Sequence, residues 1–209
     1  MPELTHRLTE AFDLVRLAHA QQVRKGSEIP YLYHLMGVSS LVLEFGGSES
    51  QAIAGLLHDV IEDCGEHYRR IVRKQFGDAV ADIVEACTDG TAESKGEHAD
   101  ADARLADWWR RKLTYLEHLR DADDSTLLVS ACDKLHNARA IVVDIENPKI
   151  GQEVFKRFTA GRDGTLRYYH SLAAMFVARG AKPAQQLESV VTRMHLLADD
   201  AKRVALQQQ

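Results

Sequence analysis

Apolar residues recur along this chain at the spacing of helices rather than of strands. Leu128, Ala131, Leu135, Ala138 and Val142 follow one another at alternating intervals of three and four residues, which places them on one face of a helix. Only 4 prolines interrupt the 209 residues, so long helices can form. The pattern predicts an all-α protein with helices at about 4–23, 34–44, 48–63, 66–76, 78–87, 104–120, 125–144, 151–160, 163–179 and 184–205.

One helix start and one irregular segment can be read from local sequence. Ser48 follows two glycines and precedes Gln51 by three residues, which is the pattern of a capping box at the beginning of a helix. The stretch Thr88–Arg104 is polar and rich in Ala, Asp, Glu and Gly. We expect a surface loop or a lid there, and composition alone does not choose between them.

Composition narrows the class of protein. A length of 209 residues with 45% hydrophobic positions suits one globular domain. No apolar run approaches the roughly 18–20 residues of a membrane span, and the N-terminus lacks the apolar segment of a signal peptide. The three cysteines form no CxxC pair, which favours a reducing cytoplasm. A net charge of −5 with mixed signs indicates no nucleic-acid surface. The oligomeric state stays open, a homo-oligomer included.

The segment 56–63 combines apolar residues with a cluster of ionisable side chains. On a helix, His58 lies four residues before Glu62. Asp59 and Asp63 have the same spacing, so all of these side chains project from neighbouring turns. Three carboxylates gathered in this way would repel one another unless a cation sits among them. The alternative is an amphipathic surface helix with a solvated polar face.

Two residues elsewhere could join such a site. His34 begins a predicted helix after a loop, a position where a lone histidine more often caps or packs than binds a metal. Asp133 follows the apolar stretch 127–132, and an unpaired buried carboxylate is costly. Its structural partner would be Lys134 or Arg139, whereas Asn137 shares its face of the helix one turn later.

An ordered set of short motifs carries a family resemblance. The motifs are residues 18–25 (AHAQQVRK), 30–34 (PYLYH), 56–63 (LLHDVIED), 76–80 (FGDAV) and 133–137 (DKLHN). In this order the chain resembles the hydrolase domain of the RelA/SpoT alarmone enzymes, and specifically the stand-alone small alarmone hydrolases of the HD superfamily, which include metazoan SpoT homologues. The resemblance covers about residues 10–145. It implies a single HD-type helical bundle over 1–209, with C-terminal helices at about 150–205 as an extension.

The resemblance also implies a metal centre. Its ligands would be His34, His58, Asp59 and Asp133. The ion in such proteins is typically Mn²⁺, and imidazole and carboxylate ligands without a thiolate suit this metal or another divalent one. A coordinated water with a lowered pKa would then serve as the nucleophile at neutral pH.

Catalytic and substrate-binding residues follow from the same resemblance. Glu62 and Asp63 match a Glu-Asp pair that positions or deprotonates the water and protonates the leaving oxygen, and their division of labour stays open. Arg24 and Lys25 match a pair that grips the phosphates of the substrate, although basic residues at a helix end also complement the helix dipole. Asn137 matches a residue that contacts the nucleotide.

The chain departs from the family pattern at three places. Leu35 follows His34 where proline is usual, which changes the helix start and not the ligand. Cys64 stands where threonine is common. The loop from Arg24 to His34 is one residue longer than in the bifunctional enzymes, which leaves the placement of its basic residues open.

The function implied by the resemblance is hydrolysis of a guanosine alarmone. We expect a cytoplasmic, Mn²⁺-dependent guanosine-3′,5′-bis(diphosphate) 3′-pyrophosphohydrolase that converts (p)ppGpp to GDP or GTP and pyrophosphate. Its partner would be this small nucleotide, with no nucleic acid and no membrane. One alternative keeps the metal centre but takes another nucleotide, such as an adenosine alarmone, a nucleoside phosphate or the 2′-phosphate of NADPH. Another is a nucleotide-sensing or toxin-neutralising protein in which binding matters more than turnover.

Overall fold

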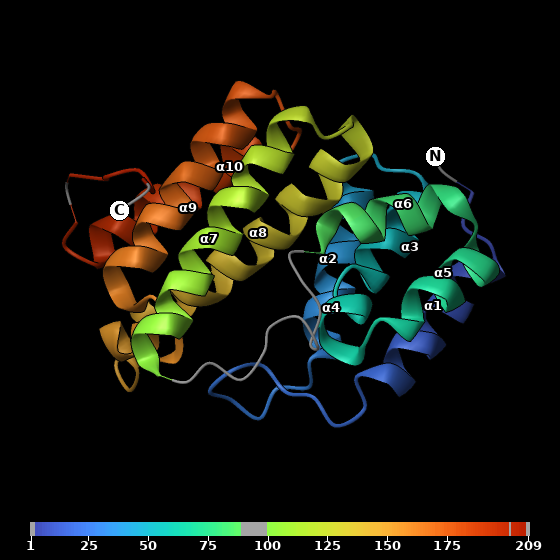
Figure 1. Ribbon diagram of the computed structural model, residues 1–209, viewed down its shortest axis with the longest axis horizontal. Helices are drawn as coiled ribbons and strands as arrows, with labels where there is room; N and C mark the ends of the chain where they lie inside the picture. Colours follow the sequence, from blue (N-terminus) through green and yellow to red (C-terminus); the bar gives the residue numbers. More distant parts are fainter. Residues whose placement is uncertain (1–2, 89–99, 201, 208–209) are drawn as a thin grey trace. The chain divides into compact units, whose positions relative to one another are not determined.

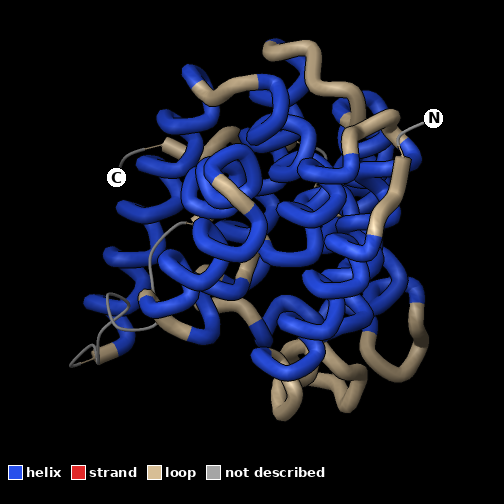
Figure 2. The backbone as a smooth tube through the Cα atoms, turned by 90° about the vertical axis from the view of Figure 1, so that its right-hand side faces the viewer, coloured by secondary structure: helices blue, strands red, loops and turns tan. Residues whose placement is uncertain are grey.

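The computed structural model describes residues 3–88, 100–200 and 202–207, and the regular elements among them are helices (Figure 1, Figure 2). The all-α prediction is therefore confirmed for this part of the chain. In order, the elements are α1 (His6–Ala18), α2 (Leu32–Glu44), α3 (Glu49–Leu57), α4 (Val60–Cys64), α5 (His67–Phe76), α6 (Asp78–Cys87), α7 (Ala101–Asp121), α8 (Asp124–Glu146), the 3₁₀ helix η1 (Gly151–Arg157), α9 (Gly161–Ala178) and α10 (Ala184–Leu197).

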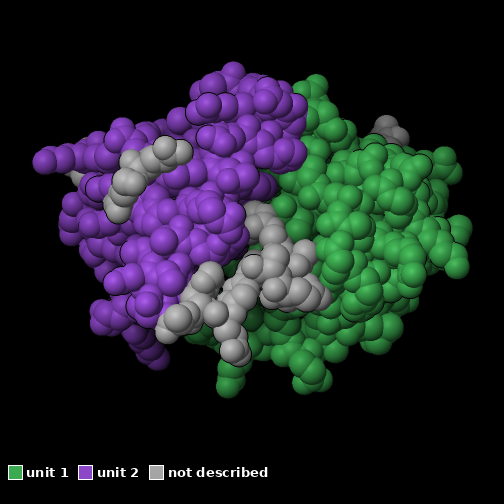
Figure 3. Space-filling model, in the orientation of Figure 1, with its two compact units in different colours: residues 1–96, 123–133 green, residues 97–122, 134–209 purple. Residues whose placement is uncertain are grey.

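The chain divides into two compact units, which Figure 3 colours separately. Unit 1 consists of residues 1–96 and 123–133, and unit 2 of residues 97–122 and 134–209. Helix α8 crosses this division, because its first turns belong to unit 1 and the rest to unit 2. The single domain that we expect over 1–209 stays a prediction.

Unit 1 is built around a close contact between α2 and α3. Gly55 makes the contact possible, because a Cβ at this position would lie 3.2 Å from the Cα of Ser39 and 3.3 Å from a methyl of Val42. The hydroxyl of Ser39 donates across the same interface to the carbonyl of Ala52 at 2.8 Å. Helices α1 and α6 also pack on α3, and α5 packs on α6. The first residues of α2 and the last residues of α3 are thus held by a tightly packed core.

The helix expected over 48–63 is present but broken. Its start is confirmed, since Ser48 and Gln51 form the reciprocal bonds of a capping box. α3 ends at Leu57, however, and α4 begins at Val60, which leaves His58 and Asp59 between two helices. His58 is 2% exposed, so the solvated polar face of a continuous helix is the wrong description. The polar side chains between the two helices instead point toward the interior of the protein.

Two other helices end earlier than the sequence pattern predicts. α1 stops at Ala18 rather than near Val23, because residues 22–31 form a tied loop in which Tyr31 N–H donates to Gln22 and Arg24 N–H donates to Ile29. α10 stops at Leu197 rather than near residue 205. There Asp199 has a left-handed φ of 54°, and the N–H of Asp200 donates to the carbonyl of His195 at 3.0 Å. This is the Schellman arrangement that terminates helices.

Unit 2 is organised by α9, which contacts α7, η1 and α10. The guanidinium of Arg179 donates to the carbonyls of Leu119 and Ala122 at 2.9 Å each, and so satisfies the end of α7. α7 begins three residues before the predicted start, because the carboxylate of Asp100 caps it by accepting from Ala103 N–H at 2.7 Å. The expected C-terminal helices are confirmed, with η1 as a 3₁₀ turn.

The predicted polar loop or lid falls mostly outside the described part of the chain, which omits residues 89–99. Its described flanks are the end of α6 and the cap of α7. Among the helices of residues 3–88, 100–200 and 202–207, none is long and apolar enough to cross a lipid bilayer.

Candidate metal centre

The four predicted metal ligands all belong to unit 1 and come from three separate segments. His34 lies in the first turn of α2, and Asp133 lies within α8. His58 and Asp59 occupy the break between α3 and α4. Both imidazoles are buried, as is Asp133, whereas the side chain of Asp59 is 17% exposed. The core that packs α2 on α3 therefore brings the two histidines together from opposite ends of the segment 34–58.

The ligand atoms of these residues converge on one point. The Nε2 atom of His58 lies 3.0 Å from Oδ2 of Asp59 and 3.6 Å from Oδ1 of Asp133. The Nε2 atom of His34 lies 3.2 Å from Oδ1 of Asp133 and 3.6 Å from Oδ2 of Asp59. The nearest ligand atoms of His34, His58 and Asp59 all lie within 4.8 Å of one another. One cation could contact this set.

The hydrogen bonding of His58 fits a metal ligand. Its Nδ1 lies 2.9 Å from the carbonyl of Gly55, which can only accept, so Nδ1 carries a proton. In the neutral ring the lone pair is then on Nε2, the atom that faces the carboxylates. This Nε2 is buried, and it faces carboxylate oxygens of Asp59 and Asp133 at 3.0 and 3.6 Å. A backbone carbonyl behind the imidazole is the usual support of a metal-bound histidine.

The pKa shifts of His58 and Asp59 also favour a cation at this site. Burial lowers the pKa of His58, but the nearby carboxylates of Asp59 and Asp133 outweigh it and hold that pKa well above its ordinary value. Burial raises the pKa of Asp59, but the charge on His58 and the hydrogen bonds of the two histidines bring it well below its ordinary value. The site thus favours positive charge between its carboxylates. A divalent cation would supply that charge without a proton.

The predicted catalytic pair lies on α4, directly after the metal ligands. The carboxylate of Asp63 accepts a hydrogen bond at 2.7 Å from the amide nitrogen of Gln22. The amide oxygen of Gln22 in turn accepts from Nδ1 of His19 at 2.6 Å. Glu62 is half-buried on the same helix. Gln22 and His19 lie in a segment that carries the family resemblance. The sequence alone does not indicate that either side chain belongs to the site.

A second unpredicted contact involves Tyr31. Its hydroxyl donates to Oδ2 of Asp59 at 2.6 Å. Its ring stacks on His19 with centroids 5.3 Å apart and meets His34 edge-on at 5.5 Å. Burial, with the charge of Asp59 next, raises the pKa of Tyr31 far above its ordinary value, so the phenol keeps its proton. Only the folded chain reveals this contact, because 28 residues separate its partners.

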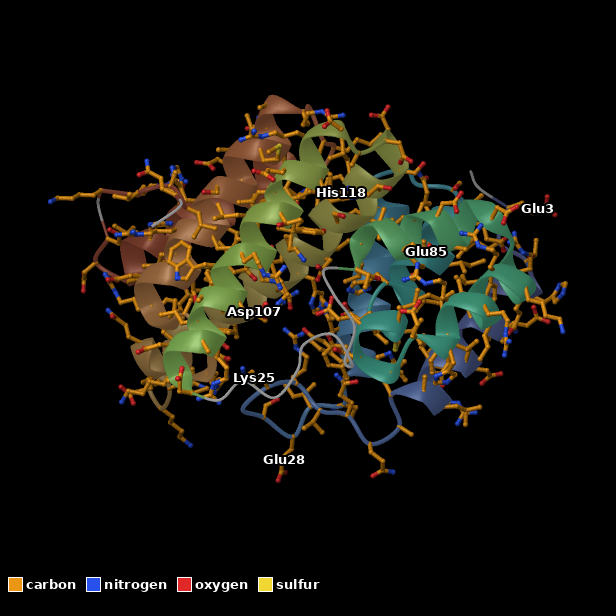
Figure 4. The ribbon with its side chains drawn as sticks, in the orientation of Figure 1. Glu3, Lys25, Glu28, Glu85, Asp107 and His118 are labelled. Carbon is orange, nitrogen blue, oxygen red and sulfur yellow. The ribbon has the colours of Figure 1, made fainter. Side chains whose placement is uncertain are left out.

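The predicted phosphate-binding residues lie on the loop before α2. The guanidinium carbon of Arg24 lies 5.8 Å from the ring centroid of Tyr31, a cation–π distance. Lys25 is exposed next to Gly26, whose φ of 76° makes the turn. Figure 4 shows Lys25 and Glu28 on this loop, with Glu28 directed away from the helices. Arg24 thus adjoins a residue that contacts the centre, whereas the role of Lys25 stays a prediction.

Asn137 lies one turn after Asp133 on α8 and is half-buried. It belongs to unit 2, whereas the converging ligands belong to unit 1. Its contact with a nucleotide stays a prediction.

Comparison with known proteins places the chain in a family. The family model described as HD domain matches residues 11–166, which is more than half of the chain. A guanosine-3′,5′-bis(diphosphate) 3′-pyrophosphohydrolase of Xenopus tropicalis is 33% identical over 135 residues, which cover 63% of this chain and 68% of that protein. A protein of the same enzyme name from Aquifex aeolicus is 29% identical over 159 residues, which cover 74% of this chain.

The matched part is a small share of the bacterial relatives. It covers 21% of the Aquifex aeolicus protein and 16% of a probable enzyme of the same name from Synechocystis, which is 34% identical over 131 residues. Among solved structures, a metazoan orthologue of SpoT described as hydrolysing ppGpp has a TM-score of 0.70 at 23% identity. The match covers 96% of this chain and 99% of that one. It shows that the two share a fold.

Proposed function

The chain belongs to the HD domain family, and we propose that it is a divalent-metal-dependent hydrolase that removes pyrophosphate from the 3′ position of guanosine alarmones. The observation that carries the proposal is the convergence of two imidazoles and two carboxylates in unit 1, at distances of 3.0 to 3.6 Å. Relatives named guanosine-3′,5′-bis(diphosphate) 3′-pyrophosphohydrolase support the substrate class.

The proposed metal ligands are His34, His58, Asp59 and Asp133. Imidazole and carboxylate donors suit Mn²⁺ and related divalent ions better than a thiophilic metal. When bound, the ion would supply Lewis-acid activation of the attacking water. The protein contributes a buried, preorganised cluster whose net charge, with neutral imidazoles, is two negative charges.

The chain's own carboxylates would move the protons. A water oxygen forms a bond to the phosphorus attached to the ribose 3′ oxygen, the bond between that phosphorus and the 3′ oxygen breaks, and the 3′ oxygen gains a proton. Glu62 and Asp63 would share these two proton transfers, one accepting from water and one donating to the leaving oxygen. The hydrogen bond from Gln22 limits rotation of the Asp63 carboxylate, which supports a fixed position for one member of this pair.

The phosphate groups of the substrate would be held by basic side chains. Arg24 suits a forked contact with phosphate oxygens and Lys25 a point-charge contact. The charge that accumulates on the phosphates during the reaction would be offset by these two residues and the ion. Asn137 would contact the nucleotide. These roles rest on the family resemblance and on the position of Arg24 beside Tyr31.

The direct test is a panel of nucleotides given to the full chain, stripped of metal and then supplied with Mn²⁺. Product chromatography should show GDP and pyrophosphate from guanosine tetraphosphate, and Asp59→Ala should remove activity because it removes a proposed ligand. Release of monophosphate, or turnover confined to an adenosine alarmone or NADPH, would assign a different phosphohydrolase. Nucleotide binding without any turnover would favour a sensing or neutralising protein.

A further inference from the structure

Tyr31 touches the proposed metal centre without being a predicted ligand. Its hydroxyl lies 2.6 Å from Oδ2 of Asp59. The same oxygen lies 3.0 Å from Nε2 of His58, so it is the oxygen that faces the imidazoles. An ionised carboxylate can only accept hydrogen bonds, and each of its oxygens has more than one lone pair. The phenol therefore donates to the ligand oxygen and leaves it room to bind a cation.

The position of this hydroxyl is fixed from several sides. The backbone N–H of Tyr31 donates to the carbonyl of Gln22 at 2.9 Å, and the carbonyl of Tyr31 accepts from the N–H of His34 at the same distance. The ring contacts the rings of His19 and His34, at centroid distances of 5.3 and 5.5 Å. The phenol consequently has little freedom to turn away from Asp59.

The carboxylate of Asp59, in contrast, is not held by its own helix, although the backbone carbonyl accepts from Asp63 N–H at 2.9 Å. Asp59 precedes α4 at the N-cap position, yet its side chain makes no capping hydrogen bond to the helix backbone. At 17% exposure its side chain can reach water. The two histidines contact its Oδ2 from the side of the proposed ion, at 3.6 and 3.0 Å, which are positions that a bound cation would take over. The hydroxyl of Tyr31 donates a short hydrogen bond to Oδ2 and so restrains the carboxylate.

We propose that Tyr31 is a positioning residue of the metal centre, whose hydroxyl keeps Oδ2 of Asp59 turned toward the histidines and so raises the affinity of the site for a divalent cation. This inference rests on the metal centre of the proposed function. Hydrogen-bond partners behind metal ligands commonly contribute a factor of about 10 to 100 in metal affinity. The aromatic ring makes separate contacts, a cation–π contact with Arg24 and a stacking contact with His19.

The roles of the hydroxyl and of the ring can be separated by substitution. Tyr31→Phe removes the hydroxyl and keeps the ring with its stacking contacts. Tyr68→Phe is the matched control, since it removes a phenol of the same unit whose ring packs against His67 at 4.4 Å. The measurement is a titration of the metal-free full chain with Mn²⁺ alone, in which free Mn²⁺ is counted by electron paramagnetic resonance. We expect Tyr31→Phe to weaken binding by about 10- to 100-fold and Tyr68→Phe to leave it unchanged.

A double-mutant cycle separates positioning from a general loss of structure. Tyr31→Phe should have little further effect on Mn²⁺ affinity in an Asp59→Asn background, because the hydroxyl acts through that carboxylate. Thermal unfolding of the metal-free variants should have similar midpoints. Wild-type affinity in Tyr31→Phe, or full additivity in the cycle, would overturn the positioning role alone. Failure of the wild-type chain to bind any divalent ion would overturn the metal centre itself, and the inference with it.

Discussion

At the scale of single residues, the site depends on side chains that hold other side chains. Gln22 presents its amide nitrogen to Asp63 and its amide oxygen to His19. Because His19 donates from Nδ1, the amide of Gln22 has one favourable orientation, with its N–H groups toward the carboxylate. Asp63 is thereby aligned from outside its own helix.

We predict that Gln22→Ala lowers turnover by about 10- to 100-fold, the range typical for loss of a supporting hydrogen bond at such a site. The affinity for Mn²⁺ should change little, because Asp63 is not among the proposed ligands. Gln22→Glu keeps the size of the side chain but replaces the donor with a charged acceptor, so it should be at least as damaging. Steady-state kinetics beside Mn²⁺ titration checks both. Turnover equal to that of the wild type in Gln22→Ala would contradict a role in aligning Asp63.

Residues predicted from the sequence belong to local motifs, whereas residues found only in the structure act through contacts between distant segments. The proposed ligands His34, His58, Asp59 and Asp133 are implied by the family resemblance that short sequence motifs carry, and the structure brings them together. Tyr31 and Gln22 act through contacts with residues 28 and 41 positions away. A local pattern does not report such contacts, because they arise only when α1, the following loop and α4 pack.

At the scale of secondary structure, the spacing of apolar residues predicts where the helices lie, whereas tertiary contacts and local turns decide where they end. The helices 66–76 and 78–87 are observed within one residue of their predicted starts, because Gly77 separates them with a left-handed φ of 83°. The break at His58 and Asp59 does not appear in the apolar pattern. It follows from the need to turn two polar side chains inward, which a continuous amphipathic helix would expose.

At the scale of the whole molecule, the proposed ligands and the pair Glu62 and Asp63 belong to unit 1, whereas Asn137 belongs to unit 2. The composition identifies a globular chain, and the helical pattern identifies its class. Neither the composition nor the helical pattern predicts the division into two units, because the division falls within α8, which is one uninterrupted helix.

We predict that Mn²⁺ stabilises the chain more as the pH rises. Carboxylates hold the pKa of His58 well above its ordinary value of 6.5. In the metal-free chain, this raised pKa contributes stability that is fully present below the unfolded-state value and is lost as the pH rises through the folded-state value. A divalent ion competes with that proton. The increase in unfolding temperature caused by Mn²⁺ should therefore grow as the pH rises above 6.5 toward the raised folded-state value of His58.

His195 provides a matched control for this experiment. It is a buried histidine beside a carboxylate, 3.0 Å from Asp200, and it lies in unit 2. His195→Asn should alter the stability of the metal-free chain without changing how the Mn²⁺ effect varies with pH. An Mn²⁺ effect that is constant across the pH range would contradict competition between the ion and the proton on His58.

The central claim is that a single divalent ion is bound jointly by side chains from three separate segments of unit 1. The most direct measurement is anomalous diffraction at the manganese edge from crystals of the full chain grown with Mn²⁺. The account predicts one strong peak within coordination distance of His34, His58, Asp59 and Asp133. A peak elsewhere, or none at this cluster while the four side chains keep their positions, would contradict it.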